Sequence, residues 1–162
     1  FARPMEVDGV AIARSDGRSA ACQARDENHP VLVHDLAGPN ARRIAFAVSE
    51  GVEDGTISRF IATAQQRGLS VTWLPDGPGL PVMRTVAMLA NEAFDAVFHG
   101  VADEADVDRA MRFGVNYPEG PAAWARAIGL QEVLAVIDNL FAAYGDPRYR
   151  ASYGLRRAAG MG

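Results

Sequence analysis

Residues 79–93 read G-L-P-V-M-R-T-V-A-M-L-A-N-E-A, and this stretch begins the part of the chain whose pattern decides the fold. Pro81 is typical of the first position of a helix, because the amide hydrogen that proline lacks would have no partner there. Apolar residues then recur at steps of three and four and share one helix face: Val82, Val86, Leu89, Ala93 and Val97. The pattern ends at Gly100, so the sequence predicts a long amphipathic helix that starts at Pro81.

Further helices are predicted after Gly100. Asp103 is a good N-cap, and Pro121 is placed to open a helix. Glycines stand where three of the helices should end, at positions 114, 129 and 145. The expected helices cover residues 103–114, 121–129, 130–144 and 153–159. Residues 79–162 are therefore predicted to form an all-helical domain.

Residues 1–78 read as strands with one helix. Apolar runs predict strands at residues 7–14, 30–34, 43–48 and 70–74, and helical spacing predicts a helix over residues 56–67. Asp16-Gly17 favours a hairpin turn, with residues 18–25 as the returning strand. Strand, helix and strand in succession imply a small parallel sheet with a right-handed crossover. The Pro- and Gly-rich stretch 75–79 divides a domain at 1–78 from a domain at 79–162.

The composition excludes several classes of partner. The 162 residues carry a net charge of −4, and the segments 1–78 and 79–162 each hold eight Arg and ten acidic residues. Neither segment is a basic arm, so no nucleic-acid partner is expected. The apolar runs are far shorter than the roughly 20 residues of a membrane span. The single cysteine, Cys22, excludes an intramolecular disulfide and favours a reducing compartment, so a cytoplasmic protein is expected. The start at Phe1 rather than Met suggests a fragment, a processed product or a disordered leader.

Four segments carry a family resemblance in matching order and spacing. They are residues 79–93, G-V-A-D-E-A-D-V-D-R-A-M-R-F-G (100–114), N-Y-P-E-G-P (116–121) and A-I-G-L (127–130). These segments resemble the C-terminal domain of the 3-hydroxyacyl-CoA dehydrogenases. Residues 1–78 more faintly resemble the reduced Rossmann-like segment found late in long, two-copy members. The chain as a whole is similar to the second, degenerate copy in such a protein.

The resemblance implies an α/β segment, built on a small reduced Rossmann-like sheet, followed by the helical C-terminal domain of that family. It also implies a parent enzyme that uses NAD to oxidise a 3-hydroxyacyl-CoA to a 3-oxoacyl-CoA in fatty acid metabolism. Long forms of this kind act on 3-hydroxybutyryl-CoA, or on 3-hydroxyadipyl-CoA in phenylacetate catabolism.

Departures from the family pattern bear on catalysis. The family motif G-F-x-V-N-R places an active-site Asn where this chain has Met83, and a thioether cannot donate the hydrogen bond of an amide. The catalytic His–Glu pair of the family lies in a full nucleotide-binding domain that has no full-length counterpart here. The nearest dinucleotide fingerprint, residues 77–82, lacks its third Gly, and Pro78 and Pro81 remove two backbone donors. We therefore expect no catalytic residue, no cofactor and no activity from this chain alone.

The loop Asn116-Tyr117-Pro118-Glu119-Gly120-Pro121 is the most informative candidate site. In the family this loop lies near the acyl pocket, so the resemblance implies that substrate is bound by Asn116, Tyr117, Pro118, Gly120 and Pro121. The alternative is a rigid turn between two helices, with its geometry set by Gly120 and Pro121.

Other candidates have plainer interpretations. His34-Asp35 at a strand end could form an acid–base pair, but a histidine bounding the sheet and an aspartate starting a turn are favoured. Cys22 is expected to be a small strand residue. The three histidines lack metal-ligand spacing, and the acidic residues at 103–108 suit a helix N-terminus, so no metal is expected. The basic tail of Arg148, Arg150, Arg156 and Arg157 suits a solvated or partner-facing surface better than the phosphates of CoA.

Two functions of different classes stay open. In the first, the chain is the non-catalytic portion of the dehydrogenase, packs against the catalytic half or a second copy of itself, and helps to form the acyl-CoA pocket. The apolar faces of residues 82–97 and 130–141 exceed what four short helices can cover, which favours an interface. In the second, the chain is a stand-alone acyl-CoA-binding or oligomerisation module. An active NAD enzyme is a third, less favoured alternative.

Overall fold

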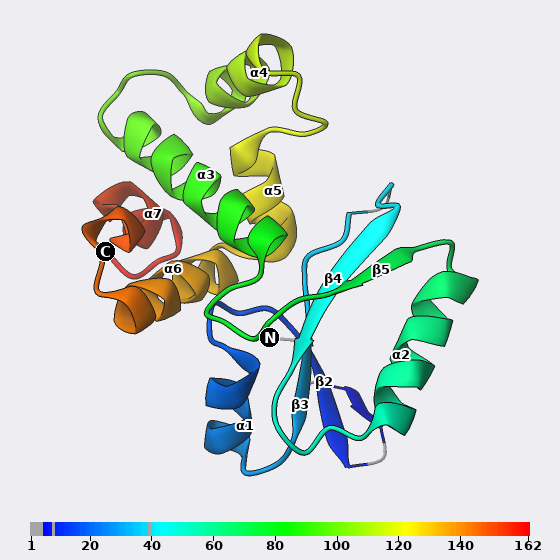
Figure 1. Ribbon diagram of the computed structural model, residues 1–162. Coiled ribbons are helices and arrows are strands. Elements are labelled where there is room, and N and C mark those ends of the chain that lie inside the picture. The colour runs from blue at the N-terminus through cyan, green and yellow to red at the C-terminus, as the bar shows by residue number, and fades with distance from the viewer. Residues whose placement is uncertain (1–4, 8, 39) are drawn as a thin grey trace. The chain divides into compact units, whose positions relative to one another are not determined.

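A five-stranded mixed sheet forms the first half of the chain (Figure 1). Its strands are β1 (Met5–Val7), β2 (Val10–Arg14), β3 (Val31–His34), β4 (Arg43–Val48) and β5 (Ser70–Trp73), and they lie side by side in chain order. The pairs β2–β3 and β4–β5 are parallel, whereas β1–β2 and β3–β4 are antiparallel. The parallel pairing predicted for the strand–helix–strand unit is confirmed in β4 and β5, and the sheet as a whole is mixed because the short connection between β3 and β4 reverses the chain.

The computed structural model describes residues 5–7, 9–38 and 40–162, with side chains from residue 9 onward. The chain divides into two units, residues 1–83 and 84–162. The predicted boundary between residues 78 and 79 stays a prediction.

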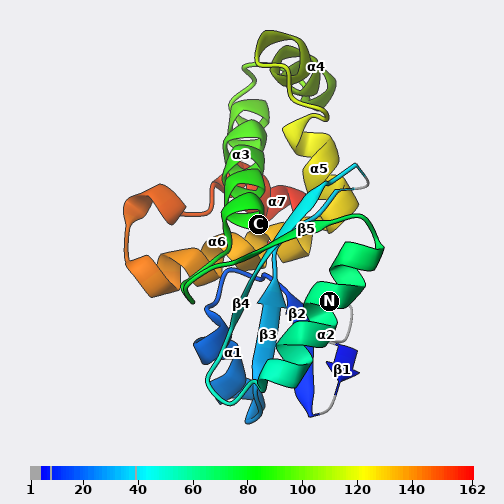
Figure 2. The same ribbon diagram turned by 45° about the vertical axis from the view of Figure 1, so that its right-hand side comes forward.

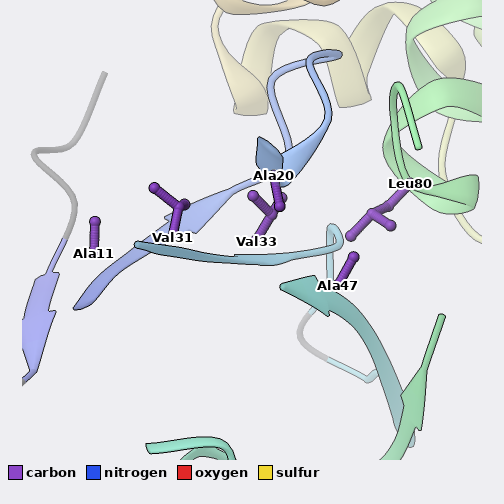
Figure 3. Close-up of a cluster of buried hydrophobic side chains, with 6 residues drawn as sticks. All are labelled: Ala11, Ala20, Val31, Val33, Ala47 and Leu80. Atoms are coloured by element: carbon purple, nitrogen blue, oxygen red, sulfur yellow. The ribbon is translucent and has the colours of Figure 1, made fainter. Parts of the chain in front are cut away.

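Two helices cover opposite faces of the sheet, α1 (Ala20–Glu27) and α2 (Asp54–Gln66) (Figure 1). Toward α1, the small strand residues Ala11, Val31, Val33 and Ala47 pack with Ala20 of α1 and with Leu80 (Figure 3). Toward α2, the strand residues Val10, Leu32 and Phe46 pack with Ile57 of α2. Strand β3 is thus buried on both faces, as its continuous apolar run predicts.

The predicted hairpin at Asp16-Gly17 is wrong. Residues 20–27 form helix α1 instead of a returning strand, so Cys22 is a helix residue. Ser19 is the N-cap, and its side chain accepts a hydrogen bond from the Cys22 amide. A hairpin does occur earlier in the chain, between β1 and β2: Val7 pairs with Val10, and Gly9 has a φ of 74°.

The helical prediction for the second half is confirmed. The structure has α3 (Pro81–Phe98), α4 (Glu104–Gly114), α5 (Pro121–Ile128), α6 (Leu130–Tyr144), a 3-10 turn (Pro147–Tyr149) and α7 (Tyr153–Ala158). The apolar side of α6 is the centre of the helical core and comprises Val133, Leu134, Val136, Ile137 and Leu140. None of the helices in the described residues is long and apolar enough to cross a membrane, and α5 and α6, which reach that length only together, are bent by 98°.

The end of the chain is fastened to α3 by the buried side chain of Asn91. Its Nδ2 donates to the carbonyl of Arg150 over 3.2 Å, and its Oδ1 accepts from the amide of Ser152 over 2.7 Å. Gly154 in α7 comes so close that an added Cβ would overlap the carbonyl oxygen of Phe94. Helix α7 therefore packs directly on the backbone of α3.

Candidate functional site

The start of α3 is capped by a carboxylate from the sheet. Asp35, which follows β3 and is fully buried, accepts hydrogen bonds from the amides of Val82 and Met83, each over 2.8 Å. Its Oδ1 also accepts from the Leu36 amide over 2.8 Å. Because Pro81 has no amide hydrogen and Leu80 has no side-chain acceptor, the first turn of α3 depends on this distant residue. The sequence analysis did not identify Asp35 as a helix cap. The available signal was that the helix opened by Pro81 has no capping side chain of its own at Leu80.

A second side chain supports the same segment. Ser15, directly after β2, is buried, and its Oγ accepts from the Leu80 amide over 3.1 Å. His34 does not join this network as an acid–base partner, since its Nδ1 lies 3.0 Å from the backbone oxygen of Asp35 and not from the carboxylate. The interpretation of His34 and Asp35 as a catalytic pair is therefore not supported by their geometry, and Asp35 is a helix cap.

Met83 lies at the position where the family resemblance expects an active-site Asn. Its side chain is only 1 % exposed, and its amide is bound to Asp35. A thioether in this place has no hydrogen to donate to a thioester or hydroxyl. The side chain of Met83 therefore contributes to packing in this structure.

The candidate loop 116–121 has an exposed first half. Asn116 and Pro118 are exposed, and Asn116 adopts the left-handed region with a φ of 58°, which Asn tolerates better than most residues. Tyr117 is half-buried, and its ring lies 5.7 Å from that of Trp124. Asn116 and Tyr117 are thus placed to meet a ligand, and their role in substrate binding stays a prediction.

The second half of the loop is buried and serves the start of α5. The Asp108 carboxylate accepts from the amides of Ala122 and Ala123 over 2.8 and 3.0 Å. Gly120 is required here, because an added Cβ would overlap the Asp108 side chain. The structure therefore gives Gly120 and Pro121 the geometric function that the alternative interpretation of the loop expects.

Helix α4 is held to α5 by polar contacts, and its apolar side is only partly covered. Glu104 forms a two-point ion pair with Arg126 over 2.7 and 2.8 Å, which raises the pKa of the guanidinium. None of the residues of α4, all of which the structure describes, is buried. Its expected apolar side comprises Val107, Ala110 and Met111, and Phe113 beside it is 80 % exposed. The helix lies at the end of the helical unit farthest from α6 (Figures 1 and 2).

The two apolar faces predicted to be free keep an exposed residue each, Val82 and Phe141, but most of their other apolar side chains are buried. Of the predicted free faces, residues 130–141 are mostly covered by the helical unit itself, and Val86 and Ala93 of the other face are buried as well. Of the large apolar residues that are more than half exposed, Val101, Phe113 and Val115 flank or end α4, whereas Trp73, Tyr153 and Met161 belong to other segments. Such a patch is typical of a surface that another protein covers.

Three arginines of the predicted basic tail line a polar hollow of about 620 Å³ in the helical unit. Two of them are already paired, Arg148 with Asp146 over 2.8 Å and Arg156 with Asp138 over 2.5 Å. Arg150 is exposed on the same hollow, whose wall also carries acidic residues, Glu92 and Asp95. The described residues contain no group of three side chains suited to hold a metal ion.

Comparison with known families matches both halves of the chain. A family model described as the C-terminal domain of 3-hydroxyacyl-CoA dehydrogenase matches residues 79–162. A second, described as the reduced Rossmann-fold domain of 3-hydroxybutyryl-CoA dehydrogenase, matches residues 12–78. The two matches follow one another without a gap and cover most of the chain.

The individual relatives have names of the same kind, each a CoA-ester dehydrogenase. The chain is 42% identical to 3-hydroxyadipyl-CoA dehydrogenase of Escherichia coli over 95% of its own length and 32% of the relative's. It is 40% identical over 76 residues to 3-hydroxybutyryl-CoA dehydrogenase of Clostridioides difficile, which is 47% of this chain and 27% of the relative. A crystal structure of 3-hydroxybutyryl-CoA dehydrogenase from E. coli matches with a TM-score of 0.87 and 40% identity over 96% of this chain and 33% of that one. The (S)-3-hydroxybutyryl-CoA dehydrogenase PaaH1 from Ralstonia eutropha matches with a TM-score of 0.71 and 27% identity over 93% of this chain and 56% of that one.

Proposed function

This chain belongs to the 3-hydroxyacyl-CoA dehydrogenase family, and we propose that it is a non-catalytic C-terminal portion of such an enzyme. The whole enzyme would use NAD to oxidise 3-hydroxybutyryl-CoA or 3-hydroxyadipyl-CoA to the 3-oxoacyl-CoA. The chain spans about a third of the length of its E. coli relative. Its part in the reaction is to pack against the catalytic half, or a second copy of itself, and to complete the acyl-CoA pocket.

The observation that carries this proposal is the buried thioether of Met83 at the position of the family's active-site Asn. A group that binds the reacting carbonyl must offer a hydrogen bond there, and sulfur offers none. The amide of Met83 is taken by Asp35, so the backbone supplies no substitute donor.

The residues present do not fit the NAD that the family implies. The turn after β2, Ser15-Asp16-Gly17-Arg18-Ser19, has one glycine where a dinucleotide-binding turn has three. Its buried carboxylate, Asp16, places a negative charge where the pyrophosphate would approach. No step of the reaction is therefore assigned to this sheet.

The incompletely covered apolar side of α4 supports the packing role. Phe113 and Val115 are exposed next to a helix that has no buried residue, and burying such side chains against a partner would stabilise the complex by about 1.5–3 kcal/mol for each large one. A partner that is itself a copy of this fold, or the catalytic half that the family pairs with it, suits this apolar surface. The exposed Asn116 and the half-buried Tyr117 follow the same helix, so they are the part of the acyl pocket that we assign to this chain.

The test is a rate assay paired with sedimentation. NADH oxidation with acetoacetyl-CoA is measured for the wild-type chain and for Met83→Asn, with the E. coli 3-hydroxyadipyl-CoA dehydrogenase as the active reference. We expect no turnover from either form of the chain, because restoring one amide supplies neither the cofactor site nor the catalytic pair. Turnover by the wild-type chain alone would overturn the proposal. Sedimentation should show self-association, or binding to the catalytic portion of the E. coli relative, and a monomer that binds neither would contradict the packing role.

An acyl-CoA-binding module is the second candidate, and the arginine-lined hollow favours it. Arg150 lies free of the ion pairs that occupy Arg148 and Arg156 in the described part of the chain, and guanidinium suits the phosphates of CoA. Calorimetric titration of acetoacetyl-CoA into the isolated chain separates the two candidates. Binding that is lost in Arg150→Ala supports the module, whereas absence of heat supports the non-catalytic portion.

A further inference from the structure

A carboxylate of the chain itself occupies the N-terminus of α1. Asp76, in the segment after β5, accepts from the amide of Ala20 over 2.7 Å and from that of Ala21 over 2.9 Å, one with each oxygen. The segment is anchored on both sides, because Leu74 and Leu80 pack into the apolar cluster that contains Ala20; Figure 3 shows Leu80 in this cluster. Asp76 is therefore held at this helix start from a position 55 to 56 residues away in the chain.

The helix start that Asp76 caps corresponds to the anion-binding position of dinucleotide-binding sheets. Helix α1 connects the parallel strands β2 and β3, and its N-terminus lies at their carboxyl ends. In dinucleotide-binding βαβ units, the pyrophosphate binds at the helix N-terminus in this position, where backbone amides and the helix dipole favour an anion. Two adjacent amides that hold two oxygens of one anion reproduce that contact.

The charged residues of the loop before α1 are also bound by partners within the chain. The Asp16 carboxylate is bound by its own loop, with Arg18 Nη2 at 2.6 Å, Arg18 Nε at 2.9 Å and the buried Gln23 amide at 3.1 Å. Arg18, the cation of the loop, also contacts Asp26 over 2.7 Å. Burial lowers the pKa of Arg18, but its hydrogen bonds and charge pairing with Asp16 and Asp26 outweigh this effect and raise it. Arg18 therefore forms ion pairs with Asp16 and Asp26 of the chain itself.

We propose that Asp76 is a built-in substitute for the cofactor's phosphate, so that the anion position of the ancestral nucleotide site is filled from within the chain. At this edge of the sheet, the hydrogen bonds from Ala20 and Ala21 to Asp76 connect α1 to the segment 74–80 and leave these amides unavailable to a ligand. This inference goes beyond the proposed function and does not depend on the acyl pocket. It explains how the sheet keeps the βαβ shape without the ligand that normally satisfies its helix start.

The test removes the carboxylate and asks whether free phosphate replaces it. Inorganic phosphate is titrated into the wild-type chain, Asp76→Ala and Asp76→Asn, with the Ala20 and Ala21 amides followed by nitrogen–proton NMR. We expect no saturable shift in the wild type and a saturable one in Asp76→Ala, with an affinity at least about tenfold higher. Asp76→Asn keeps the shape without the charge and is expected to respond in the same direction, which covers the case in which the Ala variant does not fold.

Asp108→Ala is the matched control, since Asp108 binds two adjacent amides of α5 in the same way. It should lose stability without gaining phosphate binding, because Glu119 stays next to that helix start, where its Oε1 accepts from the Gly120 amide over 3.2 Å. The inference fails if phosphate or NADH shifts Ala20 and Ala21 in the wild type. It also fails if neither Asp76 variant responds, or if the Asp108 variant responds equally.

Discussion

Replacing Asp35 with Ala tests the cap on α3, which is the contact on which the start of that helix depends. The carboxylate is fully buried and receives three amide hydrogens, from Leu36, Val82 and Met83, each over 2.8 Å. The Ala variant leaves the Val82 and Met83 amides without an acceptor. A buried donor left unsatisfied costs about 1–3 kcal/mol, so we expect a loss of about 2–5 kcal/mol from the free energy of unfolding. Domains of this size have about 5–15 kcal/mol in total, so the loss is large.

The assay is urea unfolding at 25 °C, followed by tryptophan fluorescence. Each unit contains one tryptophan, Trp73 in residues 1–83 and Trp124 in residues 84–162. Unfolding of Asp35→Ala is therefore measured in a Trp124→Phe background, in which the signal reports on the unit that contains Asp35. The midpoint should move to lower urea with little change in slope.

Asp103→Ala is the control, because Asp103 is an exposed N-cap that accepts from a single amide, that of Asp106, over 2.8 Å. Its effect, measured in a Trp73→Phe background, should be about 1 kcal/mol, the ordinary cost of losing an N-cap. The loss of stability in Asp35→Asn should lie between those of Asp35→Ala and Asp103→Ala. The side-chain oxygen of Asn still accepts a hydrogen bond, whereas its side-chain nitrogen would face a backbone donor. If Asp35→Ala costs no more than Asp103→Ala, the argument that a distant carboxylate satisfies the first turn of α3 is wrong.

Three further substitutions test other contacts. Gly154→Ala should destabilise the helical unit by about 1–3 kcal/mol in thermal unfolding, because the added methyl overlaps the carbonyl oxygen of Phe94. Gly120→Ala should cost about 1–3 kcal/mol in urea unfolding and expose the α5 amides to faster hydrogen exchange, since it displaces Asp108; unchanged exchange would argue against that cap. Phe113→Asp should leave the melting temperature within about 2–4 °C of wild type but abolish self-association in sedimentation, because the side chain is 80 % exposed. If the Phe113→Asp variant still self-associates, the interface does not lie at α4.

Local patterns were sufficient for the helical half. Pro81, Asp103 and Pro121 act on the residues next to them, so a helix start can be predicted from a few neighbouring positions. The family resemblance of residues 79–162 rests on the same local segments. The continuous apolar run of β3 likewise predicted a strand buried on both faces, which the structure has.

The error at α1 has a local cause as well. Asp16-Gly17 is a strong hairpin signal, but the hairpin lies between β1 and β2, where Val7 pairs with Val10. Residues 20–27 have little apolar periodicity, because their buried positions are a small residue, Ala20, and a polar one, Gln23. Ser19 as N-cap was the signal that could have found the helix.

The sequence by itself determined the helices of residues 79–162, the buried strand β3 and the presence of Met83 at the position of an expected Asn. Only the tertiary structure decided which carboxylate caps which helix: Asp35 for α3, Asp76 for α1 and Asp108 for α5. The physical reason is distance along the chain. A helix start requires an acceptor within hydrogen-bond reach, and the order and direction of the strands decide which distant residue supplies it.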